Sequence, residues 1–242
     1  MTKELGFLKH AVKREDRPDG AIILRSGLEM GPVARNSGEW LHHWANEAPE
    51  RVFIAERSGD GWREVTYAEM LHHVQRVASG LLARGLGQET PIVALSGPSV
   101  DHAILTLAAQ YVGVPTVPFA EQYSLIPAAH GKLRYCAAKT HPGMVYAADG
   151  GVFGDALGLD IFEGVEKVVS ENAGEDLTPF ADLAIEPTDM VDDAYERVGP
   201  ETLAKILFTS GSTSDPKGVP QTQLMMCVNQ AQYLACLPIL GA

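Results

Sequence analysis

Cysteines, basic residues and long apolar runs are scarce in this sequence, and each shortage excludes a class of protein. The three cysteines, Cys136, Cys227 and Cys236, are scattered and odd in number, which favours reduced thiols in the cytoplasm over a disulfide framework. Only 19 basic residues stand against 31 acidic ones, and the formal net charge of -12 leaves no extended basic surface for nucleic acid. Glycine, proline and glutamine interrupt the longest apolar stretch, residues 103–119, so it predicts a buried helix and strand and not a membrane span.

The 242 residues are 45% hydrophobic, enough to bury a substantial core, and their patterning changes at about residue 37. Residues 1–36 show little periodicity and contain several glycines and prolines, which predicts an irregular leader over the surface. Residues 37–242 are expected to form a single, incomplete domain. Its first helix should begin behind Ser37 as a cap, because Trp40 and Trp44 follow at helical spacing.

The clearest local signal is a capping box at Thr66-Tyr-Ala-Glu69, in which a hydroxyl and a carboxylate satisfy backbone N–H groups at a helix start. Apolar residues then recur at spacings of three and four, and Gly85 marks the end of this predicted helix. The short apolar run at residues 91–96 predicts a strand that is buried on both faces.

A second helix is expected from a cap at Ser99 to Gly113, and residues 114–119 then return as a strand. This βαβ pattern recurs more weakly through residues 143–147, 167–170 and 204–209. The acidic stretch at residues 171–196 is interpreted as a solvated connection. The sequence therefore predicts an α/β fold with a mostly parallel, layered sheet flanked by helices.

A hydroxyl-rich, glycine-containing loop follows the last of these strands. It reads Thr209-Ser210-Gly211-Ser212-Thr213-Ser214-Asp215-Pro216-Lys217-Gly218-Val219. Backbone N–H and side-chain O–H donors in such a loop can surround phosphate oxygens, while the Lys217 ammonium offsets their negative charge. Several charge-assisted hydrogen bonds of about 1.5–3 kcal/mol each can hold a triphosphate without any wider basic surface. We therefore predict that residues Thr209 to Ser214, together with Lys217, bind nucleotide phosphates.

Other chemistry fits these residues less well. A Ser-Gly-Ser tract alone more often forms an ordinary turn at a strand end, but the Pro-Lys-Gly-Val ending makes the full string rare. The string is not a Walker A loop, in which Gly-Lys precedes a Ser or Thr. The Gly-x-Ser-x-Gly elbow of a hydrolase is absent from the sequence. The adjacent histidine pairs at residues 42–43 and 72–73 do not share a helix face as two metal ligands would.

The string from Thr209 to Val219 resembles the phosphate loop of the adenylate-forming acyl-CoA synthetases, non-ribosomal-peptide adenylation domains and luciferases. Residues 65–69 (Val-Thr-Tyr-Ala-Glu) and 113–118 (Gly-Val-Pro-Thr-Val-Pro) are similar to the opening helix and the following strand of that family. Four segments carry a closer similarity to feruloyl-CoA synthetases: Gln122-Tyr-Ser-Leu125, Gly131-Lys-Leu-Arg134, the run from Lys205 to Thr213, and Thr222-Gln223, where most family members have Thr-His.

This resemblance implies ATP-dependent activation of a small carboxylic acid, such as the aromatic acid ferulate. The carboxylate would displace pyrophosphate from the α-phosphate of ATP, and the thiolate of CoA would then displace AMP from the mixed anhydride. By the same resemblance, Thr209 to Thr213 and Lys217 grip the β- and γ-phosphates, with Thr209 as the neighbour of Mg²⁺. The family usually has Gly where this chain has Ser214, and the next residue, Asp215, either weakens nucleotide affinity or helps to hold Mg²⁺.

The resemblance further implies that residues 37–242 are the first portion of a larger amino-terminal domain. The family's aromatic-Gly-x-Thr-Glu segment, its ribose-binding Asp and the catalytic Lys of its carboxy-terminal domain have no counterpart here. No catalytic residue is therefore assigned, and the chain alone is expected to bind nucleotide phosphates without turnover. The alternative is a non-catalytic remnant, or an interaction module that self-associates or joins the missing half through exposed apolar surface.

Overall fold

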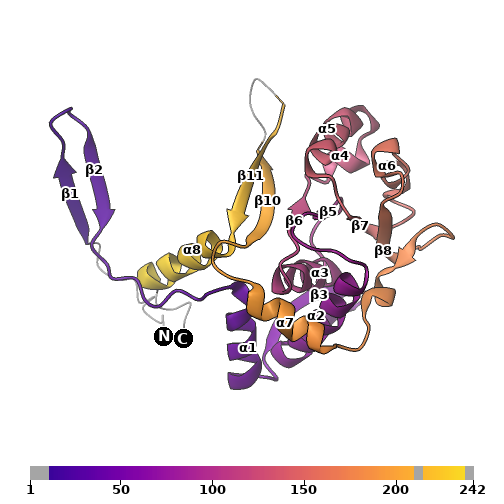
Figure 1. The fold of residues 1–242 in the computed structure, drawn as a ribbon, viewed down its shortest axis with the longest axis horizontal. Coiled ribbons are helices and arrows are strands. Elements are labelled where there is room, and N and C mark those ends of the chain that lie inside the picture. The colour runs from indigo at the N-terminus through magenta and orange to yellow at the C-terminus, as the bar shows by residue number, and fades with distance from the viewer. Residues whose placement is uncertain (1–10, 210–214, 238–242) are drawn as a thin grey trace.

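In the computed structural model, which describes residues 11–209 and 215–237, helices pack on both faces of a seven-stranded sheet (Figure 1). The strand order is β11-β10-β6-β5-β7-β8-β9. All neighbouring strands are parallel except β11, which is antiparallel to β10. The strands are β5 Ile92–Ala94, β6 Thr116–Pro118, β7 Met144–Asp149, β8 Glu166–Glu171, β9 Thr178–Pro179, β10 Leu203–Thr209 and β11 Lys217–Thr222. The predicted α/β fold with a mostly parallel sheet is confirmed.

Successive side chains of the central strands enter opposite cores. On β5, Ile92 and Ala94 belong to a hydrophobic cluster with α2 and α3, whereas Val93 belongs to a second cluster with α5 and α6. This explains why the strand is apolar at every position, since neither face meets water. The helices are α1 Ser37–Glu47, α2 Tyr67–Ala83, α3 Val100–Tyr111, α4 Gln122–Leu125, α5 His130–Thr140, α6 Gly154–Leu157, α7 Asp189–Arg197 and α8 Gln223–Cys236. Short 3₁₀ turns are η1 Pro127–Ala129, η2 Asp160–Phe162 and η3 Phe180–Leu183.

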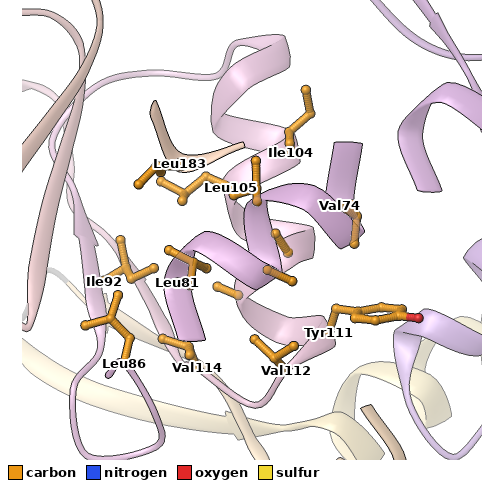
Figure 2. Packing of buried hydrophobic residues seen from close by; sticks show 14 of the residues in the cluster. Val74, Leu81, Leu86, Ile92, Ile104, Leu105, Tyr111, Val112, Val114 and Leu183 are labelled. Atoms are coloured by element: carbon orange, nitrogen blue, oxygen red, sulfur yellow. The ribbon is translucent and has the colours of Figure 1, made fainter. Parts of the chain in front are cut away.

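The predicted start and stop signals of α2 and α3 are confirmed. Thr66 and Glu69 form both bonds of the capping box, and Gly85 ends the segment with a positive φ of 73°. The Ser99 hydroxyl caps α3 by accepting from His102 N at 3.1 Å. Figure 2 shows side chains of this cluster, among them Leu81 of α2, Leu105 of α3 and Ile92 of β5. Among the described residues, no helix is both long and apolar enough to cross a membrane.

The prediction of an irregular leader is wrong for part of residues 1–36. β1 Val12–Asp16 pairs antiparallel with β2 Ile22–Ser26, and Figure 1 shows this hairpin projecting from the rest of the fold. Gly20 closes the turn with φ +83°. Nine of the ten strand residues are exposed, so no buried face imposes the period-two pattern by which a strand is recognised.

Two smaller expectations also need correction. The cap of α1 is Asn36 and not Ser37, because the Asn36 side chain accepts from Gly38 N at 3.0 Å. The acidic stretch at residues 171–196 is more than a solvated connection, since α7 within it buries Val191 and Ala194 against the rest of the core. The acidic residues of α7 lie on its exposed face, and with only two buried apolar positions among them the helical period is hard to recognise in the sequence.

Candidate functional site

The two ends of the predicted phosphate loop lie face to face. Thr209 is the last residue of β10, Lys217 is the first residue of β11, and the two are opposed in the antiparallel register. The Thr209 hydroxyl donates to the Lys217 carbonyl oxygen at 3.4 Å, and both residues are exposed. Because directly opposed residues of a hairpin project their side chains to the same face, the hydroxyl and the ammonium can act on one ligand.

The fold places this pair where α/β proteins bind ligands. β10 runs parallel to β6, so Thr209 lies at the edge formed by the carboxyl ends of the parallel strands. Below it, Phe208 packs edge-on against Phe119, which follows β6, with the ring centroids 5.5 Å apart. Gly218 lies opposite Phe208, and a Cβ atom there would stand 3.4 Å from the ring. The glycine thus leaves room beside β11 for the Phe208 ring.

Of the predicted phosphate-binding residues, the structure brings Thr209 and Lys217 together. The other five, Ser210, Gly211, Ser212, Thr213 and Ser214, lie outside the described residues. Their contact with phosphate, and the place of Thr209 beside Mg²⁺, stay predictions. Pro216 is buried between two exposed neighbours and anchors the return of the chain into β11.

Asp215 lies close enough to α5 to act on a thiol there. Burial raises the pKa of Cys136 to about 11, and the negative charge of Asp215 adds to the effect. The Asp215 carboxylate is exposed and lies in the same loop as Lys217, so it places one negative charge beside the expected phosphate position. Burial likewise raises the pKa of Cys227 in α8 to about 11.

We expect the three thiols to differ sharply in reactivity. Cys136 and Cys227 are fully buried, and their raised pKa keeps them almost entirely in the unreactive thiol form. Cys236, in contrast, is exposed. At pH 8 one thiol per chain should therefore react quickly with an aromatic disulfide, and the other two only after unfolding. Three equal rates in the native protein would contradict this burial.

The same pKa values predict how stability changes in alkali. Above pH 9 the unfolded chain releases the thiol proton, whereas the native state keeps it because its pKa is raised. Each thiol therefore contributes fully to the free energy of unfolding below pH 9. This contribution should be lost progressively between pH 9 and pH 11, which thermal unfolding midpoints at each pH will show. The double variant with Ser at both buried positions is the control, since it lacks both titrations.

A polar cleft also lies at the carboxyl ends of β7 and β8, but hydrogen-bond donors there are already bonded to protein carboxylates. Here the hairpin of β3 Val52–Ser58 and β4 Gly61–Thr66 reaches the start of α3. Arg63 of β4 pairs with Asp101 at 2.6 Å and with Glu56 at 3.1 Å, and Glu56 accepts from Val100 N at 2.8 Å. An incoming phosphate would meet carboxylates at the α3 N-terminus. Lys217, in contrast, forms no ion pair with any described residue.

The adjacent histidines do not gather into a metal centre in the part of the chain that the structure describes. His42 instead shares a hydrogen bond of 2.8 Å with the Tyr111 hydroxyl. One residue near the site was not singled out for a role by the sequence. Gln223, noted only as a family departure, is fully buried at the first position of α8. A polar residue directly after the Thr222 cap was the available signal, but its burial depends on tertiary packing.

A mostly parallel sheet flanked by helices defines an α/β protein as the class. The chain belongs to the AMP-binding enzyme family, whose model matches residues 41–239. It is 30% identical over 225 residues to the probable non-canonical nonribosomal peptide synthetase CymA of Salinispora arenicola, covering 91% of this chain and 3% of that one. It is 29% identical over 179 residues to the long-chain-fatty-acid–CoA ligase FadD15 of Mycobacterium bovis, covering 70% of this chain and 28% of the ligase.

Solved structures share the fold. A long-chain-fatty-acid CoA ligase from Rhodopseudomonas palustris superposes with a TM-score of 0.63 at 18% identity, over 82% of this chain and 47% of that one. The N-terminal domain of FACL13 from Mycobacterium tuberculosis gives 0.61 at 22% identity, over 78% and 45%. The fold is thus that of the amino-terminal domain of adenylate-forming enzymes, and the chain spans less than a third of the two curated relatives named above.

Proposed function

We propose that this chain carries the triphosphate-binding part of a ligase that activates a carboxylic acid with ATP and transfers the acyl group to CoA. The observation that carries the proposal is the apposition of Thr209 and Lys217 at the carboxyl edge of the sheet, at the two ends of the predicted phosphate loop. Membership of the AMP-binding enzyme family supports the nucleotide, and the fatty-acid–CoA ligase among the relatives supports the acceptor.

The described residues fit an anion together with its cation. The Lys217 ammonium is exposed and unpaired with any described carboxylate, so it can bind the β- and γ-phosphates and stabilise the charge that grows on pyrophosphate as the α-phosphate bond breaks. The Thr209 hydroxyl donates its proton to the Lys217 carbonyl oxygen, but its own oxygen keeps lone pairs that suit Mg²⁺, which supplies further charge neutralisation when bound. As the resemblance implies, we propose that these 242 residues alone bind nucleotide without turnover.

The acid is proposed to be aromatic, such as ferulate. This rests only on the four segments that resemble feruloyl-CoA synthetases, since the relatives reported above are named for peptide synthesis and for long-chain fatty acids. The unpaired cysteines support a reducing compartment such as the cytoplasm.

Calorimetric titration of the chain with ATP tests the proposed function. We expect saturable heat that needs Mg²⁺ and that pyrophosphate competes away, because the proposed contacts are to the β- and γ-phosphates. AMP should compete weakly, since it lacks both groups. Heat that is absent, or that AMP suppresses as well as pyrophosphate does, would overturn the proposal.

A second candidate function is suggested by the outer surface of α8. Four large apolar side chains on this helix are exposed by about two fifths or more: Leu224 37%, Met225 57%, Tyr233 52% and Leu234 42%. An apolar cleft of about 350 Å³ adjoins it, lined in part by Trp40, Trp44 and Tyr233. Exposed apolar area of this kind favours association between copies or with another chain. Light scattering against concentration, with and without Mg²⁺ and ATP, separates an association module from a nucleotide binder.

A further inference from the structure

The side chain of Gln223 joins two helices at the base of the β10–β11 hairpin. It has no exposed surface, and its carbonyl oxygen accepts from Ser37 N, the first N–H of α1, at 3.0 Å. Its amide nitrogen donates to the carbonyl oxygen of Gln110, in the last turn of α3, at 3.2 Å. The N–H groups at a helix start and the C=O groups at a helix end lack intrahelical partners, so this one amide helps to satisfy both termini.

The same residue closes the hairpin. Gln223 N donates to the Thr202 carbonyl oxygen at 3.0 Å, and Leu224 N donates to Pro200 O at 2.8 Å. Thr202 directly precedes β10, and Thr222 at the end of β11 is paired with Leu203. The segment before β10 and the segment after β11 are therefore fixed to each other and, through the Gln223 amide, to α1 and α3.

Beyond this base, the hairpin is held by its pairing with β6 and by the packing of Ile206 and Phe208 against the second hydrophobic cluster. β10 is joined to the parallel sheet by a single register pair, Lys205 with Thr116, and β11 is the edge strand. Pro220 in the middle of β11 cannot donate a ladder hydrogen bond, as is usual at an edge. The aromatic contact of Phe208 with Phe119 holds one face of the hairpin. The base must supply the remaining constraint on its direction.

We propose that Gln223 is a positioning residue for the phosphate loop: by fixing the base of the hairpin to α1 and α3, it sets the place of Thr209 and Lys217 at the far end, about 20 Å along the strands. This inference rests on the proposed function of that loop. It predicts that breaking the amide contacts changes both the mobility of β11 and the affinity for nucleotide.

The structure offers a matched control in Asn36. Its side chain is also buried, accepts from Gly38 N at 3.0 Å at the start of α1, and donates to the Val198 carbonyl oxygen at 3.0 Å. Asn36 and Gln223 thus make the same kinds of bond to the same helix start, but Asn36 does not contact the hairpin. Asn36→Ala should lower the unfolding midpoint without moving the loop.

The experiment compares Gln223→Met, which keeps the volume and removes both bonds, with Asn36→Ala. Two quantities are measured at a temperature where both are folded: hydrogen exchange of the β11 amides, and the dissociation constant for MgATP. We expect Gln223→Met to speed β11 exchange by about tenfold or more and to weaken MgATP binding by about tenfold, which corresponds to about 1.4 kcal/mol. Asn36→Ala should leave both unchanged.

Equal effects of the two variants, or none, would overturn the positioning role. If the unsubstituted chain binds no MgATP, the proposed function fails, whereas the exchange rates still decide whether Gln223 fixes the hairpin. If Gln223→Met does not fold, Ser37→Pro reaches the same contact from α1. Proline is favoured at a first helical position, and Asn36 before it is already extended at φ -152° and ψ 168°. The ring removes the donor and occupies the space of the Gln223 oxygen, so the same changes in exchange and affinity are expected.

Discussion

Lys217→Ala should weaken MgATP binding by about ten- to a hundredfold. A charge-assisted hydrogen bond to phosphate contributes about 1.5–3 kcal/mol, and every 1.4 kcal/mol is about tenfold in affinity. The described residues provide no carboxylate partner that the lysine would leave behind, so the folded state should lose little. Since the side chain is exposed, the free energy of unfolding should change by less than about 0.5 kcal/mol, as is usual for surface substitutions.

Lys205→Ala is the matched control for this loss. Lys205 lies on the same hairpin and, like Lys217, forms no ion pair with a described residue, but it is placed at the base, opposite Gln221. A general effect of net charge would weaken binding equally in both variants, whereas a local phosphate contact affects only Lys217. Lys217→Arg should keep part of the affinity, because the charge remains while its geometry changes. Unchanged affinity in Lys217→Ala would remove this lysine from the site.

Asp215→Asn tests the charge on the other side of the loop. If the carboxylate only repels phosphate, its removal should tighten MgATP binding several-fold and lessen the effect of salt. If the carboxylate instead helps to hold Mg²⁺, the same substitution weakens binding, and most of all at low Mg²⁺ concentration. The two results are opposite in sign, so one pair of titrations decides between the alternatives that the sequence leaves open.

The sequence predicts the central sheet well because its signals there are local. The capping box at Thr66, the stop at Gly85 and the cap at Ser99 are read from single residues, and the structure contains all three. The exposed hairpin at residues 12–26 escaped prediction because nothing buries one of its faces. α7 escaped because acidic residues surround its two buried apolar positions.

The candidate site is predicted only in part for a related reason. The spacing from Thr209 to Lys217 marks one loop, but the sequence does not show that the chain returns beside β10. Gly218 and Pro220 in β11 are poor strand formers, and they are tolerated because β11 lies at the sheet edge and because the Phe208 ring packs beside the glycine. Gln223 depends on three segments far apart in sequence, and no local pattern encodes such a contact.

Gly80→Ala should destabilise the fold more than any other small substitution argued from this structure. A Cβ atom on Gly80 in α2 would stand 1.9 Å from the Leu183 carbonyl oxygen and 2.8 Å from the carbonyl carbon. The obstacle is backbone, which cannot rotate away as a side chain can, and Figure 2 shows Leu183 in the cluster packed around α2. Either η3 leaves the helix or α2 shifts from the sheet, and we expect a loss of about 3–5 kcal/mol in unfolding free energy.

Gly131→Ala in α5 is the control, because the substitution is the same and the surroundings are not. No described atom lies within 4 Å of a Cβ atom there, and neither glycine has a positive φ. Alanine has the higher helix propensity, so this variant should gain up to about 1 kcal/mol. Urea unfolding of both variants therefore separates the cost of a steric clash at Gly80 from the gain in helix propensity that the same substitution gives at Gly131. A Gly80→Ala protein as stable as the parent would show that η3 does not pack against α2, contrary to the packing of Leu183 described here.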